Sequence, residues 1–128
     1  MKRDISSRDD IMILVNSFYN EVKQDESLRI IFNDVAKINW ETHLPKMYDF
    51  WENVIFHTGA YRGNTLKVHL NLNDLYPILA EHFERWIELF TKTVNELFEG
   101  ENAQMALNKS GSISTVIRVK LANQKKEL

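Results

Sequence analysis

The sequence predicts an all-α protein that forms a single domain over residues 1–128. Only two prolines and four glycines interrupt the chain, so long helices can form. Over several long stretches, apolar residues recur every three or four positions, which is the spacing of one face of a helix. A chain of this length has room for one hydrophobic core but is too short for two domains.

The composition excludes several classes of protein. A hydrophobic fraction of 44% and a charged fraction of 27% are ordinary for a globular protein. The formal net charge of −2 gives no general attraction to nucleic acids or to anionic membranes. The absence of cysteine excludes disulfide bonds and metal sites built on thiolates. The N-terminus has no apolar run typical of a signal peptide, and no stretch is long enough to span a bilayer, so we expect a cytoplasmic location.

The first helix is expected from Ser7, which can cap it, with Asp9 and Asp10 near its positive end. Its apolar face consists of Ile11, Val15, Phe18 and Val22. A further turn or two of helix is expected around residues 28–32, ended by the Asn-Asp pair at 33–34.

The second long helix has two possible starting points. Asn39 can cap it, but Pro45 fits best in the first turn of a helix, which would move the start to His43. We expect the helix to close at Gly59. Its broad apolar stripe consists of Trp40, Leu44, Met47, Trp51, Val54 and Ile55.

Residues 60–74 are the least regular part of the sequence, and a long irregular segment in a compact domain often has a function. Pro77 suits an early position of the next helix, which should end before Gly100. The apolar face of that helix consists of Leu79, Phe83, Trp86, Phe90, Val94 and Leu97. Residues 116–121 alternate as in a strand, but a lone strand would have no partner, so we predict a helical tail.

Four side chains could together form a functional pocket. Tyr19, His43 and Trp86 lie on apolar helical faces, and His69 lies inside the apolar stretch 66–72. An imidazole on a metal, opposite a set of hydrogen-bond donors, is how a helical protein would hold haem and its gaseous ligand. Taken singly, each residue is more often structural, as a core aromatic, a surface histidine or a satisfied core histidine. The remaining histidines, at positions 57 and 82, are expected on helix surfaces.

Several segments, in this order and at this spacing, resemble the group III truncated haemoglobins. The resemblance covers residues 11–97. The segments that carry it are Phe18-Tyr19, Ile31-Phe32-Asn33, Trp40-Glu41-Thr42-His43, Phe50-Trp51, Lys67-Val68-His69-Leu70 and Glu81-His82-Phe83-Glu84-Arg85-Trp86.

The resemblance implies a truncated globin, in which two helices cross two others around haem b. It implies that His69 is the iron ligand and that Tyr19, His43 and Trp86 face the ligand of the haem. His43 is expected to move between an inward and an outward position. Apolar contacts to the porphyrin would come from Phe32, Met47, Phe50, Trp51, Leu66, Leu70 and Phe83.

Such a protein is expected to bind dioxygen, nitric oxide and carbon monoxide, and to release dioxygen slowly. The alternative is an enzyme for nitric oxide dioxygenation or a peroxidase-like reaction, which would need an external reductase as partner. A third possibility, a haem-free helical interaction module, requires all four pocket residues to be structural. The oligomeric state is left open.

Overall fold

The computed structural model describes residues 2–59, 63, 69, 71, 73 and 78–126, and all regular structure in that part of the chain is helical. The elements are α1 (Arg8–Gln24), the π-helix η1 (Ile30–Val35), α2 (Trp40–Phe56), α4 (Ala80–Leu97) and α5 (Glu101–Lys126). The predicted all-α class is confirmed, and so is the choice of a helix for the tail.

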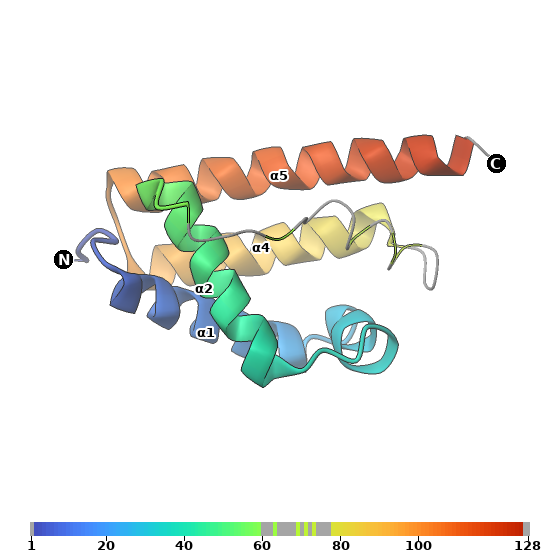
Figure 1. Ribbon diagram of the computed structural model, residues 1–128, viewed down its shortest axis with the longest axis horizontal. Helices are drawn as coiled ribbons and strands as arrows, with labels where there is room; N and C mark the ends of the chain where they lie inside the picture. The colour runs from blue at the N-terminus through green and yellow to red at the C-terminus, as the bar shows by residue number, and fades with distance from the viewer. Residues whose placement is uncertain are drawn as a thin grey trace.

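The long helices form two layers of two, α1 with α2 and α4 with α5 (Figure 1). Helices α4 and α5 lie side by side and run in opposite directions, while α2 crosses the molecule on the near side of Figure 1. Helix α1 packs against both α2 and α4, and α2 also contacts α5. The helices therefore enclose one main core, to which α1, α2, α4 and α5 all contribute.

The core is rich in aromatic rings. Phe18 on α1 and Phe90 on α4 are fully buried, and Trp51 on α2 stacks on Phe90 with ring centroids 4.7 Å apart. A second, smaller cluster joins Phe83 on α4 to Ile117 on α5. Aromatic rings bury large areas of apolar surface, so this arrangement ties the two layers together.

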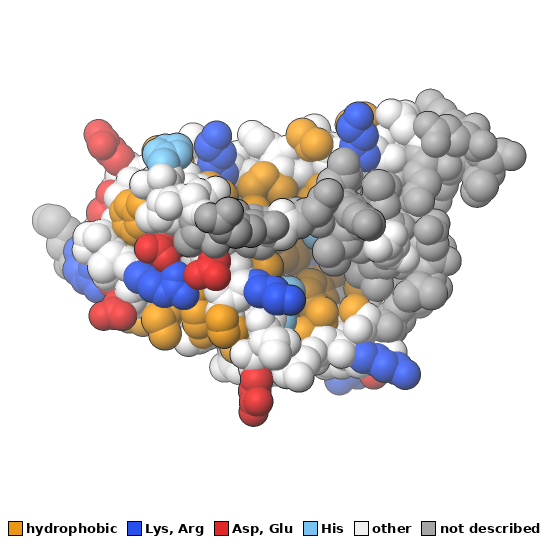
Figure 2. All heavy atoms as spheres, viewed as in Figure 1, with side chains coloured by type: hydrophobic (Ala, Val, Ile, Leu, Met, Phe, Trp, Pro, Cys, Tyr) orange, Lys and Arg blue, Asp and Glu red, His pale blue; other side chains and the backbone are white. Residues whose placement is uncertain are grey.

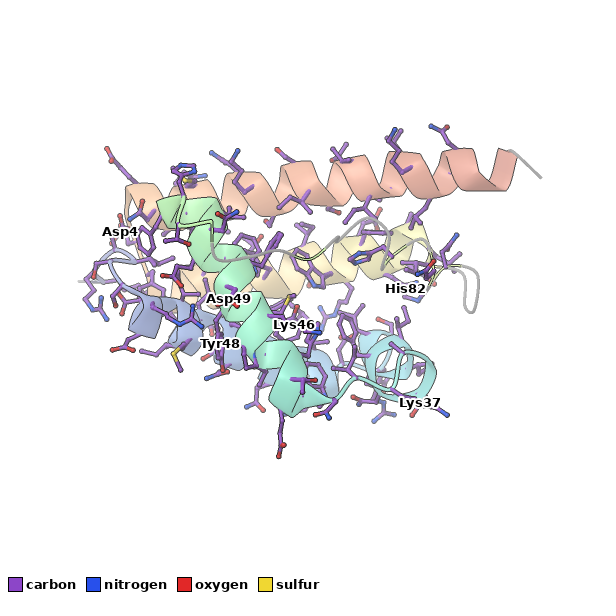
Figure 3. All side chains as sticks on the ribbon, in the orientation of Figure 1. Asp4, Lys37, Lys46, Tyr48, Asp49 and His82 are labelled. Carbon is purple, nitrogen blue, oxygen red and sulfur yellow. The ribbon has the colours of Figure 1, made fainter. Side chains whose placement is uncertain are left out.

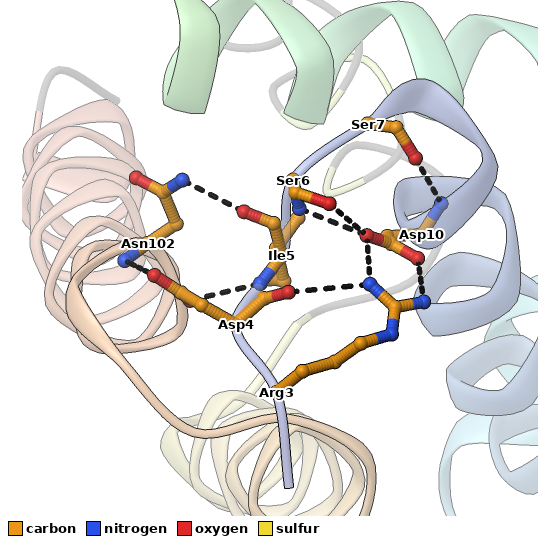
Figure 4. A network of polar contacts seen from close by, with 7 residues as sticks. All are labelled: Arg3, Asp4, Ile5, Ser6, Ser7, Asp10 and Asn102. Carbon is orange, nitrogen blue, oxygen red and sulfur yellow. Dashed lines mark hydrogen bonds and ion pairs between the residues drawn. The ribbon is translucent and has the colours of Figure 1, made fainter.

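The N-terminal segment joins the start of α1 to the start of α5 (Figure 4). Both carboxylate oxygens of Asp10, which is only 2% exposed, accept hydrogen bonds from the Arg3 guanidinium. The carboxylate of Asp4 accepts the backbone N–H groups of Asn102 and Ala103, each at 2.9 Å. Asp4 thus satisfies N–H groups at the start of α5 that have no partner within the helix.

The ends of α1 and α2 follow from their capping residues. Ser7 caps α1 as predicted, accepting the N–H of Asp10. Asn39 caps α2 by accepting the N–H of Glu41 at 3.1 Å, so the helix begins at Trp40 and the alternative start near His43 is wrong. Pro45 is accommodated inside the helix.

Three other expectations about boundaries need correction. The segment predicted at 28–32 continues as a π-helix to Val35, so the Asn-Asp pair at 33–34 does not end it. Helix α2 closes at His57, whose left-handed φ of 57° makes it the C-cap in place of Gly59. Helix α4 begins at Ala80, later than predicted, and Pro77 lies outside the described residues.

Within residues 60–74, predicted to be irregular, His69, Asn71 and Asn73 have helical backbone, and Gly63 is the other described residue. No helix in the described part of the chain is both long and apolar enough to cross a membrane.

Candidate functional site

Tyr19 is the centre of an aromatic cluster between α1, η1 and α2. Its side chain is only 4% exposed, and its ring centroid lies 5.4 Å from that of Trp40, 5.5 Å from His43 and 6.0 Å from Phe32. Burial raises the pKa of the Tyr19 phenol well above its ordinary value. The hydroxyl therefore stays protonated at neutral pH and is available as a hydrogen-bond donor.

His43 lies in the first turns of α2, edge-on to the rings of Tyr19 and Trp40. Its Nε2 atom is buried and has no hydrogen-bond partner among the described residues. Burial, assisted by the charge of Lys46 on the same helix (Figure 3), lowers the pKa of His43, so the imidazole is neutral at neutral pH. A buried polar atom without a partner costs about 1–3 kcal/mol, so this atom calls for a partner that the described residues do not supply.

Trp86 reaches this cluster indirectly. It is half-buried on α4, stacked on Phe90 at 5.3 Å, and it meets the edge of Phe18 at 5.1 Å. Phe18 in turn contacts Tyr19 at 4.9 Å between ring centroids. The structure therefore brings Tyr19 and His43 together directly and joins Trp86 to them through one intervening ring.

His69 is half-buried and has helical backbone. Its neighbours at 66–68 and 70 lie outside the described residues, and with them the predicted contacts Leu66 and Leu70. The role of His69 as a metal ligand thus stays a prediction from the sequence.

The other predicted apolar contacts divide into two kinds. Phe32, Met47 and Phe50 are half-buried and pack against the main core, so each keeps surface that a large apolar molecule could cover. Figure 2 shows hydrophobic side chains reaching the surface beside α2 on this face. Trp51 is only 2% exposed and Phe83 lies in the second cluster, so both are largely covered by the protein itself.

Two side chains have roles that the sequence did not indicate. Trp40, expected in an apolar stripe and in the segment 40–43 that carries the resemblance, contacts Tyr19 and His43. A signal was present, because Trp40 precedes His43 by three positions and so shares its helix face. His82, expected on the surface, is only 6% exposed, because its Nδ1 turns back to accept the N–H of Leu79 at 2.9 Å at the start of α4 (Figure 3).

Comparison with known proteins identifies the family. No protein-family model matches the chain. Group 3 truncated hemoglobin ctb of Campylobacter jejuni is 31% identical to it over 118 residues, which cover 90% of this chain and 91% of that protein. The crystal structure of group III truncated hemoglobin from Campylobacter jejuni matches with a TM-score of 0.82 at 31% identity, covering 94% of this chain and 95% of the other. The chain belongs to the group III truncated haemoglobins.

Proposed function

We propose that this protein holds haem b and binds diatomic gases, dioxygen foremost, beside Tyr19 and His43. The observation that carries the proposal is the buried Nε2 of His43, which has no partner among the described residues and lies next to a protonated phenol. Kinship with proteins named truncated hemoglobins supports it. A polar ligand in this pocket would satisfy the His43 imidazole and the Tyr19 hydroxyl together.

The residues present fit such a group. When bound, haem would supply an iron that can bind both an imidazole and a small gas. His69 is the residue we assign to the iron, and Tyr19, His43 and Trp86 are those we assign to the gas. The apolar residues assigned to the porphyrin are Phe32, Met47, Phe50, Trp51, Leu66, Leu70 and Phe83.

The donors in the pocket favour a ligand that carries negative charge. The Tyr19 O–H and the Trp86 indole N–H can each donate one hydrogen bond. A hydrogen bond to a charged group contributes on the order of 1.5–3 kcal/mol, so each donor would slow release by about one to two orders of magnitude. Dioxygen would gain more from these donors than carbon monoxide, because dioxygen would carry more negative charge in this site.

The test is the absorption spectrum of the purified protein, oxidised, reduced and after exposure to carbon monoxide. We expect a Soret band that shifts on reduction and again on addition of the gas, with one haem bound per chain. Protein that is folded by circular dichroism but takes up no haem from a stoichiometric haemin solution would contradict the proposal.

A further inference from the structure

Trp40 links the Tyr19–His43 pair to a cation. The Nζ atom of Lys23 lies over the Trp40 ring, 4.6 Å from its centroid. Within the described residues Lys23 forms no ion pair, so the face of the indole is the contact of its ammonium group. A cation within about 6 Å of an indole centroid is attracted by the negative face of the ring.

The backbone on either side of Trp40 is held in place, so the ring has a defined position. The Asn39 carbonyl accepts the N–H of His43 at 2.9 Å, and the Asn39 side chain caps the helix one residue before Trp40. The N–H of Ile38 bonds to the carbonyl of Phe32 at 3.0 Å, and the Phe32 ring stacks on Trp40 at 16° between planes.

His43 is therefore flanked by Trp40 at 5.6 Å and by Tyr19 at 5.5 Å. An outward movement of the imidazole would change its contact with the Trp40 ring. Movement of the Trp40 ring away from His43 would break its stacking on Phe32 and its contact with Lys23.

We propose that Lys23 and Trp40 together act as positioning residues that hold the His43 imidazole inward beside Tyr19, and so limit how fast a small ligand reaches the pocket. The proposal rests on the proposed function for the identity of that ligand. The Lys23–Trp40 pair does not touch the ligand and acts only through His43.

The first test measures carbon monoxide association with the reduced haem protein by flash photolysis. Lys23→Met keeps the length of the side chain but removes its charge, and it should speed association about two- to fivefold, the share of one cation–π contact. Lys23→Arg keeps the cation and should restore the parent rate. Lys92→Met, which removes the same charge from an exposed position on α4, is the control and should leave the rate unchanged.

The second test asks whether the effect passes through His43. In a His43→Leu background there is no imidazole to hold, so Lys23→Met should then change nothing. The infrared band of bound carbon monoxide should gain a component of higher frequency in Lys23→Met alone, since fewer polar groups face the gas. An equal acceleration with and without His43 would overturn the proposal.

A third measurement does not depend on haem. The imidazole C–H resonances of His43, labelled in the purified protein, should be displaced by the neighbouring rings and move toward free-imidazole values in Lys23→Met and Trp40→Phe. If the protein shows no Soret band but the His43 resonances shift as expected in both variants, the proposed function is contradicted and the positioning role is not. A normal Soret band with unchanged His43 resonances and rates would contradict the positioning role alone.

Discussion

The imidazole of His43 has two features that oppose its protonation. It is half-buried, and burial together with the nearby charge of Lys46 lowers its pKa below the usual value. The neighbouring phenol of Tyr19, on α1, stays protonated and so offers no negative charge to stabilise an imidazolium. Protonation of an inward His43 is therefore disfavoured, and an imidazolium is more stable in solvent.

We predict that ligand association speeds up as the pH falls below about 6.5, because protonation drives His43 outward. In the folded protein the inward imidazole binds its proton less tightly than an imidazole in solvent. The inward form should therefore predominate at neutral pH and be lost on acidification. Lys46→Met removes the charge that lowers the pKa and should move the transition to higher pH. Association rates between about pH 5 and 7.5 test this, and a parent rate independent of pH, matching that of His43→Leu, would rule it out.

Tyr19 and Trp86 should control dioxygen release more than carbon monoxide release. Tyr19→Phe and Trp86→Phe keep rings that pack on Phe18 but lose a donor, so each should speed dioxygen dissociation by about 10- to 100-fold. Tyr48→Phe is the matched control, since its hydroxyl bonds to Asn16. Stopped-flow measurement of the dissociation rates of both gases tests this prediction. Equal acceleration for the two gases would indicate easier passage out of the site and not the loss of a hydrogen bond.

For single residues, the sequence could suggest which residue types form the proposed site but not all their contacts. The approach of Tyr19 and His43 was expected from the resemblance, which implies that both side chains face the ligand of the haem. The contacts of Trp40 with Lys23 and Phe32 were not predicted, because those two residues come from separate segments. Contacts between segments are set by packing, which helical spacing alone does not specify.

The helices themselves were largely predictable. A helix that buries one face repeats apolar residues at helical spacing, so α1, α2 and α4 could be read from the sequence. The π-helix η1 could not, because a widened turn has no distinct spacing over six residues. The start of α2 was ambiguous because the Asn39 cap and Pro45 favour different positions, and the cap prevailed.

The junction between α4 and α5 depends on a glycine. Gly100 has a φ of 143°, which other residues rarely adopt, and a Cβ there would collide with the Asp4 side chain that caps α5. Burial alone would raise the pKa of Asp4, but backbone N–H groups, those of Asn102 and Ala103 first, lower it. Asp4 is thus held as a carboxylate at the positive end of α5.

We predict opposite effects for two Gly→Ala substitutions beside and within α5. Gly100→Ala should lower the free energy of unfolding by about 1–3 kcal/mol, through backbone strain and loss of the Asp4 cap. Gly111→Ala meets nothing within 4 Å and lies inside a helix, so it should raise stability by about 0.5–1 kcal/mol. Urea unfolding at neutral pH compares them, and a neutral Gly100→Ala would refute the role of this junction.

Across the whole molecule, the proposed site lies where the α1–α2 layer faces α4. Tyr19 and His43 belong to α1 and α2, while Trp86 belongs to α4 and is reached through Phe18. Half-buried apolar side chains around them remain incompletely covered by the described chain. A flat apolar cofactor bound there would add contacts to both layers, so its binding and the folding of the protein should be coupled.

The coupling predicts that haem raises the stability of the protein, and that His69 carries much of the effect. A ligand that binds only the folded state adds about 2.7 kcal/mol at a concentration one hundred times its dissociation constant. Thermal unfolding with and without stoichiometric haemin should therefore show a clear rise in midpoint for the parent chain. His69→Ala should lose most of the rise and most of the bound haem. His57→Asn is the matched control, because an exposed residue in left-handed conformation is replaced by one that tolerates it. A His69→Ala protein with the parent's midpoint shift and an unchanged five-coordinate ferrous spectrum would show that another residue holds the iron.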